Sequence, residues 1–247
     1  MKIAFLFPGQ GSQYAGMAKE FIEQFQESRE VFDIAGSALG YDLAQLCTQG
    51  PVEKLNLTEN TQPAILAASI AILRPLERRG LLAAAAAGHS LGEYTAITAA
   101  GGIALQDAVV LIQKRGRFMQ EAVPAGTGLM AAILGMERQD VEKTCLEAAE
   151  NGIVAPANYN SPGQIVIAGE KQAVEKAMEL ARAAGAKKVI PLAVSVPSHC
   201  AMMKAAGDRL AEELERVAIN DLSIPIVNNA DAKFVQMASE LRPSLIK

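Results

Sequence analysis

The segment Gly88-His89-Ser90-Leu91-Gly92 has the pattern G-x-S-x-G. In a strand-turn-helix elbow, this pattern holds a serine hydroxyl clear of the backbone so that it can attack an acyl carbon. The two glycines permit close packing around a strained serine, and Glu93 would lie in the first turn of a helix ending near Ala100, where a carboxylate suits the helix dipole. The pattern predicts an acyl-serine enzyme. The alternative is an ordinary serine that caps a helix after a glycine.

The segment before the elbow, Ala83 to Ala87, must form a strand for this interpretation to hold. Alanine favours helices over strands, so burial in a central sheet must override the local preference.

A serine needs a base to remove its proton, and His199 is the only histidine downstream of Ser90. His199 follows Pro197-Ser198, where we predict a boundary between two parts of the chain and hence a cleft. The alternative is a surface histidine at a helix start. His89 lies inside the elbow and should point away from Ser90, which favours a structural role.

A hydrolase triad would also need a carboxylate between the serine and the histidine. The candidates, Asp107 and Asp140, both lie in predicted solvated helix starts. The sequence therefore favours a Ser-His dyad over a triad.

The oxyanion formed during acyl transfer needs two backbone donors. The elbow supplies the N–H of Leu91, and the loop Gly9 to Gln13, which follows a predicted buried strand Lys2 to Phe7, could supply a second near Gln10. A plain turn is the alternative.

The same loop does not match a dinucleotide-binding site, because Tyr14 stands where the third glycine of G-x-G-x-x-G is needed.

The remaining elements predict two parts with different organisation. Tyr14 to Leu82 is mainly helical, and Leu105 to Ala122 is a further helix. After Pro124-Ala125-Gly126 the order becomes β-α-β-β-α-β, which is the ferredoxin-like unit. The expected segments are Leu129 to Leu134, Gln139 to Glu150, Val154 to Asn158, Gln164 to Ala168, Lys171 to Ala184, Lys188 to Val194, then a helix near Ala201 to Val217 and a strand near Ile224 to Asn228. Helix breaks are expected at Gly36, Gly40, Gly50-Pro51 and Gly80. We predict an α/β body formed by residues 1–126 and 196–247, with residues 127–195 as an inserted small domain.

Composition excludes several classes of protein. The net charge of -4 and the absence of tryptophan argue against a nucleic-acid partner. Two histidines make a metal site improbable, and no apolar stretch reaches the roughly 18 residues of a membrane span. The three cysteines form no C-x-x-C pair, which favours a reducing compartment, so we expect a cytoplasmic protein.

Six stretches together resemble the malonyl-CoA:acyl-carrier-protein transacylases of bacterial fatty acid synthesis. They lie within residues 4 to 230 and, in combination, are highly specific. The stretches are Phe7-Pro8-Gly9-Gln10-Gly11-Ser12-Gln13, Gly88-His89-Ser90-Leu91-Gly92-Glu93, Arg115-Gly116-Arg117-Phe118-Met119-Gln120, Asn158-Tyr159-Asn160-Ser161-Pro162-Gly163-Gln164, Ser195-Val196-Pro197-Ser198-His199 and Val227-Asn228-Asn229.

The resemblance implies an α/β-hydrolase-like body with a ferredoxin-like insert. It implies that Ser90 accepts the acyl group, that His199 is the base, and that Gln10 and Leu91 are the oxyanion donors. It further implies that Arg115 clamps the malonyl carboxylate, which a guanidinium can do with two parallel donors. Without the resemblance, Arg115 would be a solvated helix residue. Malonyl-CoA would be a substrate, acyl carrier protein the partner, and no cofactor would be needed.

The resemblance ends before the C-terminus. Members of the family continue past the equivalent of Lys247 with a glutamine that orients the histidine, a glycine-rich loop and further core elements, and Leu241 to Lys247 does not match them. We therefore expect a less stable chain and a less well oriented His199. A serine esterase and a carrier-binding remnant with little activity remain as alternatives.

Residues 182–209 carry five cations against one aspartate. Because carrier proteins are generally acidic, we expect this segment to steer their docking. The alternative is a solvated basic face.

Overall fold

The computed structural model describes residues 2–124, 126–192 and 196–246. These residues form two compact units, one of residues 1–117 with 210–247 and one of residues 118–209. The predicted insert, residues 127–195, falls inside the second unit, although residues 193–195 lie outside the described residues. Helices α7 and α10 each run from one unit into the other.

The first unit contains the predicted elbow. Its elements are β1 (Ala4–Phe7), α1 (Lys19–Gln24), α2 (Gln26–Leu39), α3 (Leu43–Gln49), α4 (Val52–Leu55), α5 (Thr58–Arg78), β2 (Ala85–Gly88), α6 (Leu91–Ala99), most of α7 (Leu105–Ala122), most of α10 (Lys204–Arg216), β7 (Ile226–Val227), β8 (Phe234–Val235) and α11 (Ala238–Ile246). The strands form one sheet in the order β1-β2-β7-β8, in which only β8 is antiparallel to its neighbour.

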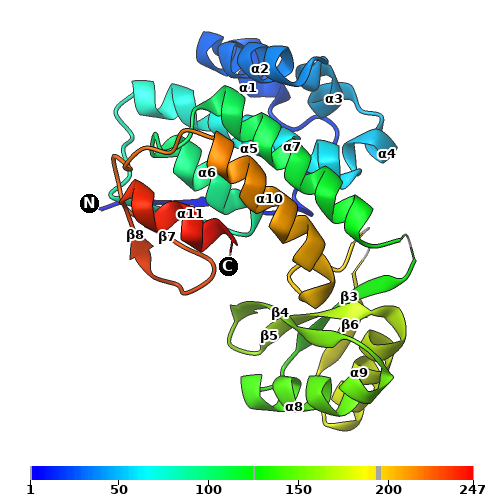
Figure 1. The fold of residues 1–247 in the computed structure, drawn as a ribbon. Coiled ribbons are helices and arrows are strands. Elements are labelled where there is room, and N and C mark those ends of the chain that lie inside the picture. Colours follow the sequence, from blue (N-terminus) through cyan, green and yellow to red (C-terminus); the bar gives the residue numbers. More distant parts are fainter. Residues whose placement is uncertain (1, 125, 193–195, 247) are drawn as a thin grey trace. The chain divides into compact units, whose positions relative to one another are not determined.

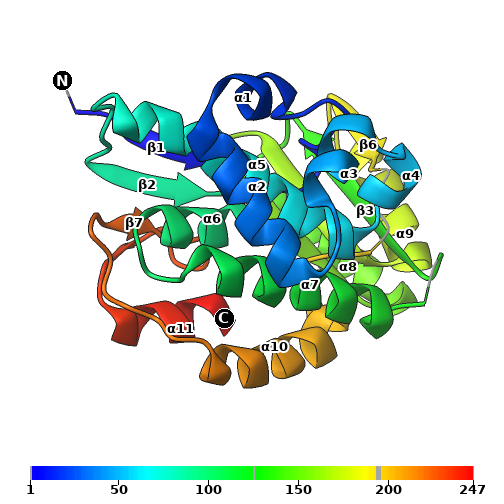
Figure 2. The same ribbon diagram turned by 90° about the horizontal axis from the view of Figure 1, so that it is seen from above.

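Layers of helix cover this sheet. Helix α6 packs against β1 and β2, α5 packs against α6, and α2 packs against α5 (Figure 2). Most of α5 is buried, including Ile65, Leu66 and Ile70. The strand β2 forms between β1 and β7 despite its alanines, of which only Ala86 is buried, so pairing with both neighbouring strands overrides the local preference there.

Two expectations for this unit are wrong. Gly36 does not break a helix, because α2 continues through it to Leu39 and ends at Gly40 in the left-handed conformation. The strand β1 is not fully buried, since Leu6 exposes 79% of its surface while Phe7 is buried. Side chains alternate across a strand, and one face of this edge strand is uncovered in the described chain.

The second unit has the predicted element order (Figure 1). Its elements are β3 (Gly128–Leu134), α8 (Arg138–Ala148), a 3-10 turn (Ala149–Asn151), β4 (Val154–Ser161), β5 (Gln164–Glu170), α9 (Lys171–Ala183), β6 (Lys188–Pro191) and a 3-10 turn (Ala201–Met203). The sheet order is β4-β5-β3-β6, antiparallel throughout, which is the ferredoxin-like arrangement. Strand β4 extends to Ser161, so the hairpin is tighter than expected.

The core of the second unit lies between this sheet and its two helices, where Ile133, Ile167 and Val174 are buried. Periodic alanines at 173, 177 and 181 let α9 approach the sheet closely. The fold class is therefore α/β with a parallel sheet, as predicted, and the second unit is compatible with the expected ferredoxin-like insert.

Candidate active site

Ser90 lies in a strained turn between β2 and α6. Its backbone has φ 53° and ψ -109°, a combination that an L-residue adopts only when its surroundings enforce it. The side chain makes no capping hydrogen bond to α6, so the helix-cap alternative does not describe this serine. A strained serine in a turn between a strand and a helix is the backbone arrangement of a nucleophile elbow.

The glycines on both sides of Ser90 are required by packing. A Cβ on Gly88 would overlap the backbone of Gly92, and a Cβ on Gly92 would lie 2.4 Å from the carbonyl oxygen of Phe7. A side chain at either position would therefore push the elbow off the sheet.

The first loop lies beside the elbow because β1 and β2 are parallel and end together, with Phe7 paired to Gly88. The His89 N–H donates to the Phe7 carbonyl at 3.0 Å. A Cβ on Gly9 would lie 2.6 Å from Nδ1 of His89, so the imidazole of His89 packs on the first loop. This contact agrees with the structural role expected of His89.

Gln10 in this loop is half-buried, and its Nε2 donates to the hydroxyl of Thr58 at 3.1 Å. Leu91, at the start of α6, is buried. The two predicted oxyanion donors thus follow neighbouring parallel strands, Gln10 in the loop after β1 and Leu91 at the first residue of the helix after β2.

The guanidinium of Arg115 is hydrogen-bonded to Ser90 and Gln62 and is not the solvated helix residue that the sequence alone would suggest. Its Nη2 donates to the Ser90 hydroxyl at 3.1 Å and its Nη1 donates to Oε1 of Gln62 at 2.7 Å. The guanidinium carbon lies 5.6 Å from the ring centre of the buried Tyr94, within range of a cation–π contact. Its helical neighbour Lys114 instead pairs with Glu213 at 2.6 Å.

Gly116 explains how Arg115 reaches the elbow. A Cβ at this position would lie 2.6 Å from the Thr58 carbonyl and 2.7 Å from the Cα of Glu59. Only glycine lets α7 cross this close to the start of α5, where Gln62 lies.

A second group of polar residues contacts the elbow. Sequence patterns placed Glu93 in the first turn of the helix and Asn229 in one of the family stretches, but they predicted no contact between the two. Asn229 accepts the Ser90 N–H at 3.0 Å and donates to both the Gly88 carbonyl and Glu93. Glu93 is 5% exposed, and burial raises its pKa against the opposing effects of hydrogen bonds from Asn229 and Ser244 and the charge of Arg115. Asn228 and Asn229 directly follow β7. Because ligands and catalytic groups gather at the carboxyl edge of a parallel sheet, this position could have marked the two asparagines as site residues from the sequence.

His199 belongs to the second unit, just after Pro197 and Ser198. It is exposed and has a positive φ of 60°. The Ser198 N–H before it lies 3.3 Å from the sulfur of Met130 and 3.1 Å from the Val196 carbonyl oxygen. Ser195 of the same stretch lies outside the described residues. Asp107 and Asp140 are both exposed in first helical turns, as expected.

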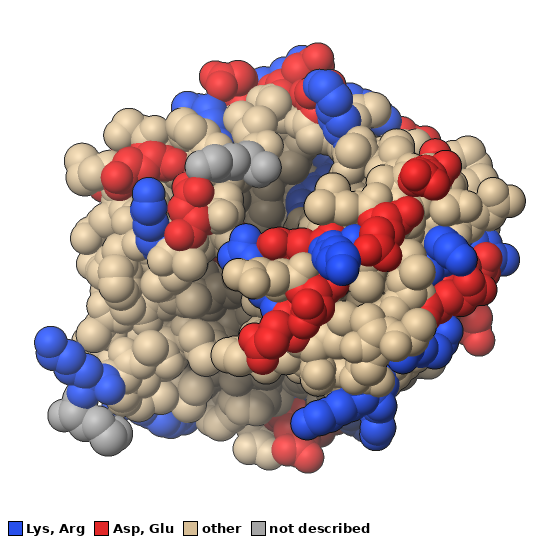
Figure 3. All heavy atoms as spheres, turned by 90° about the horizontal axis from the view of Figure 1, so that it is seen from below, with Lys and Arg blue, Asp and Glu red and all other residues tan. Residues whose placement is uncertain are grey.

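The part of the chain that the structure describes holds no cluster of three or more His, Cys, Asp or Glu arranged to bind a metal ion. Within the same residues, no helix is long and apolar enough to cross a membrane. On the face drawn in Figure 3, basic and acidic side chains are interspersed.

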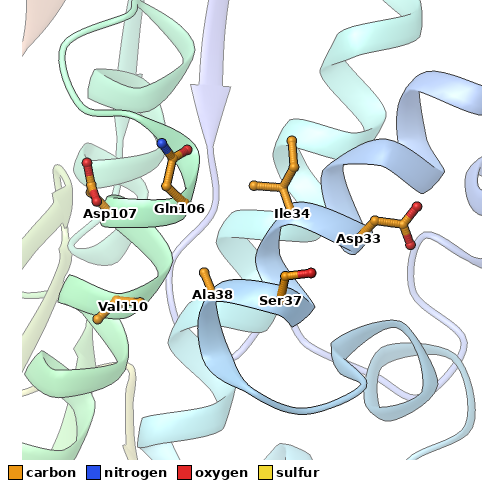
Figure 4. A pocket seen from close by; sticks show the side chains of 7 residues that line it. All are labelled: Asp33, Ile34, Ser37, Ala38, Gln106, Asp107 and Val110. Carbon is orange, nitrogen blue, oxygen red and sulfur yellow. The ribbon is translucent and has the colours of Figure 1, made fainter.

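A groove of about 780 Å³ lies elsewhere in the first unit, between α2 and α7 (Figure 4). Its lining includes Asp33 and Ser37 from α2 and Asp107 from α7, but neither Ser90 nor Arg115.

Comparison with known proteins agrees with this geometry. The family model "Acyl transferase domain" matches residues 4–237. The Malonyl CoA-acyl carrier protein transacylase of Escherichia coli is 52% identical over 247 residues, which are all of this chain and 80% of that protein. The transacylase of Bacillus subtilis is 47% identical over all of this chain and 78% of its own length.

Solved structures show the same relation. A crystal structure of an acyl carrier protein S-malonyltransferase from Vibrio cholerae has a TM-score of 0.96 at 50% identity, covering 100% of this chain and 81% of that one. A malonyl-transacylase solved in complex with its type II PKS acyl-carrier protein has a TM-score of 0.97 at 49% identity, covering 100% and 80%. The chain belongs to the family of malonyl-CoA:acyl-carrier-protein transacylases.

Proposed function

We propose that this chain moves a malonyl group from malonyl-CoA to the pantetheine thiol of acyl carrier protein, through an ester on Ser90, for fatty acid synthesis. The observation that carries this proposal is the hydrogen bond of 3.1 Å between Arg115 and the Ser90 hydroxyl. A malonyl group attached to Ser90 ends in a carboxylate only two bonds beyond its acyl carbon. A guanidinium at this distance can therefore pair with that carboxylate while the ester is held.

In the first half-reaction, the Ser90 oxygen attacks the thioester carbon of malonyl-CoA and His199 takes the serine proton. The oxyanion of the tetrahedral intermediate accepts hydrogen bonds from the backbone N–H groups of Leu91 and Gln10. The carbon–sulfur bond then breaks, and coenzyme A leaves with the proton held by His199.

The second half-reaction repeats these steps with the pantetheine thiol as the nucleophile. His199 takes the thiol proton, the sulfur attacks the malonyl ester, and the proton returns to Ser90. Malonyl-CoA is consumed as a substrate, and the reaction needs no cofactor. We place it in the cytoplasm, because the three cysteines are free thiols of the kind a reducing compartment preserves.

A serine esterase would use the same elbow but has no use for a cation beside the nucleophile, so Arg115 and the family assignment both favour the transferase. A carrier-binding remnant would keep the fold without forming an ester.

Intact-protein mass spectrometry after mixing with malonyl-CoA separates these functions. We expect one malonyl adduct in the wild-type chain and none in Ser90→Ala, while His199→Ala should form the adduct roughly 10²- to 10⁴-fold more slowly. The absence of an adduct in the wild-type chain would favour the remnant, and an adduct retained in Ser90→Ala would exclude the serine mechanism.

A further inference from the structure

Every polar group of the Asn229 amide is engaged around the nucleophile. Its Oδ1 accepts the Ser90 N–H at 3.0 Å, and its Nδ2 donates to the Gly88 carbonyl at 2.7 Å and to Oε2 of Glu93 at 2.6 Å. An amide can make these three bonds in one orientation only, because the Ser90 N–H needs an acceptor while the Gly88 carbonyl and a carboxylate need donors. The side chain thus joins the end of β2, the nucleophile and the first turn of α6.

Glu93 holds Asn229 in this position. Its Oε2 accepts two bonds from Asn229, from the side chain and from the backbone N–H at 3.0 Å, while Oε1 accepts from the Ser244 hydroxyl at 3.4 Å. The carboxylate is almost fully buried, and an acidic side chain is rarely buried unless it is paired. A neutral residue would fill the same space at a lower desolvation cost, so the carboxylate needs an explanation beyond packing.

Ser90 supplies that explanation. Its backbone has a positive φ of 53°, a strained conformation that relaxes unless the surroundings hold it. The bond from its N–H to Asn229 is a direct restraint on that backbone. Because the same backbone angles set the directions of the Ser90 hydroxyl and of the following Leu91 N–H, the restraint fixes the nucleophile and an oxyanion donor together.

We infer that Glu93 and Asn229 are positioning residues, which hold the Ser90 backbone in its attacking conformation through a carboxylate-amide clamp. The inference rests on the proposed function, in that Ser90 must be the acyl acceptor. In this proposal the clamp acts on the reaction through the Ser90 backbone.

Single-turnover acylation by malonyl-CoA tests the clamp, because it reports a rate constant and an amplitude separately. We expect Asn229→Ala to lower the rate constant of Ser90 acylation by roughly 10- to 100-fold, with every folded molecule still acylated. Glu93→Gln should have an effect in the same direction, and the two effects should not be additive, because each variant breaks the same clamp. The preference for malonyl over acetyl groups should stay unchanged, since Arg115 is intact.

Asn228→Ala is the matched control. Asn228 is a buried asparagine next in sequence, and it bonds to Ser244 and to the Lys233 N–H but not to Ser90. We expect this variant to lower stability while keeping the acylation rate constant.

The variant Asn229→Asp adds a second measurement, the pH dependence of the acylation rate, which would not change if Asn229 only supported the fold. The substituted side chain can still accept the Ser90 N–H, but its second oxygen faces the Gly88 carbonyl and Glu93, which accept only. The groups facing that oxygen and Glu93 are Ser244 from α11 and Arg115 from α7. We expect the ratio of the Asn229→Asp acylation rate to the wild-type rate to rise as pH falls, because one proton shared with Glu93 restores one of the two missing donors.

The possible outcomes separate the clamp from the proposed function. If the wild-type chain takes up malonyl and Asn229→Ala acylates at the wild-type rate constant, with or without a lower amplitude, the clamp is overturned and the function stands. If the Asn228→Ala control loses rate as strongly as Asn229→Ala, the clamp is overturned as well. If the wild-type chain forms no ester at Ser90, the proposed function falls and the inference falls with it.

Discussion

The guanidinium of Arg115 donates to the hydroxyl of Ser90 at 3.1 Å, although 25 residues separate them in sequence. This contact joins the group that we expect to recognise the substrate to the group that we expect to react with it. A malonyl group on Ser90 would exchange the hydroxyl for a carboxylate as the acceptor of Arg115, so that the cation is paired both before and after acylation.

Substitution of Arg115 should change the choice of acyl group. A malonyl carboxylate entering this partly buried site needs a paired cation, and an acetyl group does not. Losing one partner of such a pair costs roughly 2 to 5 kcal/mol, which corresponds to about 30-fold to several thousandfold in relative specificity. Arg115→Ala should lose malonyl transfer while keeping or gaining acetyl transfer, measured as the ratio of kcat/KM values.

The control for this experiment is Lys114→Ala, which removes a neighbouring cation that pairs with Glu213 instead. Equal loss of malonyl and acetyl transfer in Arg115→Ala would show that the arginine supports the fold rather than reading the carboxylate.

Gln62 should matter through Arg115. Its Oε1 accepts from Nη1 of Arg115 at 2.7 Å, and Gln62 is 1% exposed. Gln62→Leu removes this acceptor while filling a similar volume, so a hydrogen bond to a charged group, worth roughly 1.5 to 3 kcal/mol, is lost. We expect KM for malonyl-CoA to rise by about tenfold or more with little change in acetyl transfer. Unchanged malonyl kinetics would separate Gln62 from substrate recognition.

The free energy of unfolding should depend on pH through the titration of Glu93. Burial raises the pKa of Glu93 above its usual 4.5, so the folded chain holds this proton at pH values where the unfolded chain has released it. The contribution of this group is fully present below about 4.5 and is lost as pH rises through the folded-state pKa. Glu93→Gln cannot titrate, so its unfolding free energy, relative to that of the wild-type chain, should increase with pH above about 4.5.

Urea denaturation of both chains across this pH range gives the difference directly. A difference that decreases with pH would mean that hydrogen bonding and the charge of Arg115 outweigh burial at this carboxyl.

Carrier docking should depend on cations in the second unit. Two of the five cations in residues 182–209 are paired, Lys204 with Asp208 at 2.9 Å and Arg209 with Glu121 at 2.6 Å. Lys187, just before β6, and Lys188, its first residue, are both exposed. Reversing both charges should raise KM for the carrier protein and flatten its salt dependence, while acylation by malonyl-CoA is unchanged.

Lys143→Glu on α8 of the same unit is a suitable control, because Lys143 is exposed and pairs with Glu147. If reversal at Lys187 and Lys188 leaves the carrier KM and its salt dependence as in the wild-type chain, this segment is a solvated face.

Local patterns were enough to predict the elbow sequence and the element order of the second unit, whereas the strand before Ser90 was expected against the local preference of its alanines. The apolar run of β3 and the period of α9 are properties of neighbouring residues, and both elements are present in the structure. The clamp could not be predicted in this way, because Asn229 and Glu93 are 136 residues apart and meet only once β2 and β7 are paired. The same holds for Arg115 and Gln62, whose contact depends on the crossing of α7 and α5 at Gly116. Gly36 failed as a helix break because burial of Val31, Phe32 and Ala35 holds α2 together around it.

The central claim is that the malonyl group passes through Ser90 on its way to the carrier. Rapid mixing of the chain with labelled malonyl-CoA, followed by addition of acyl carrier protein, follows the label through one turnover. We predict that one equivalent of coenzyme A is released before the carrier is added, that the label is then on Ser90, and that it leaves Ser90 at the rate at which it appears on the carrier. Label that reaches the carrier without a stage on Ser90, or faster than it leaves Ser90, would contradict the account.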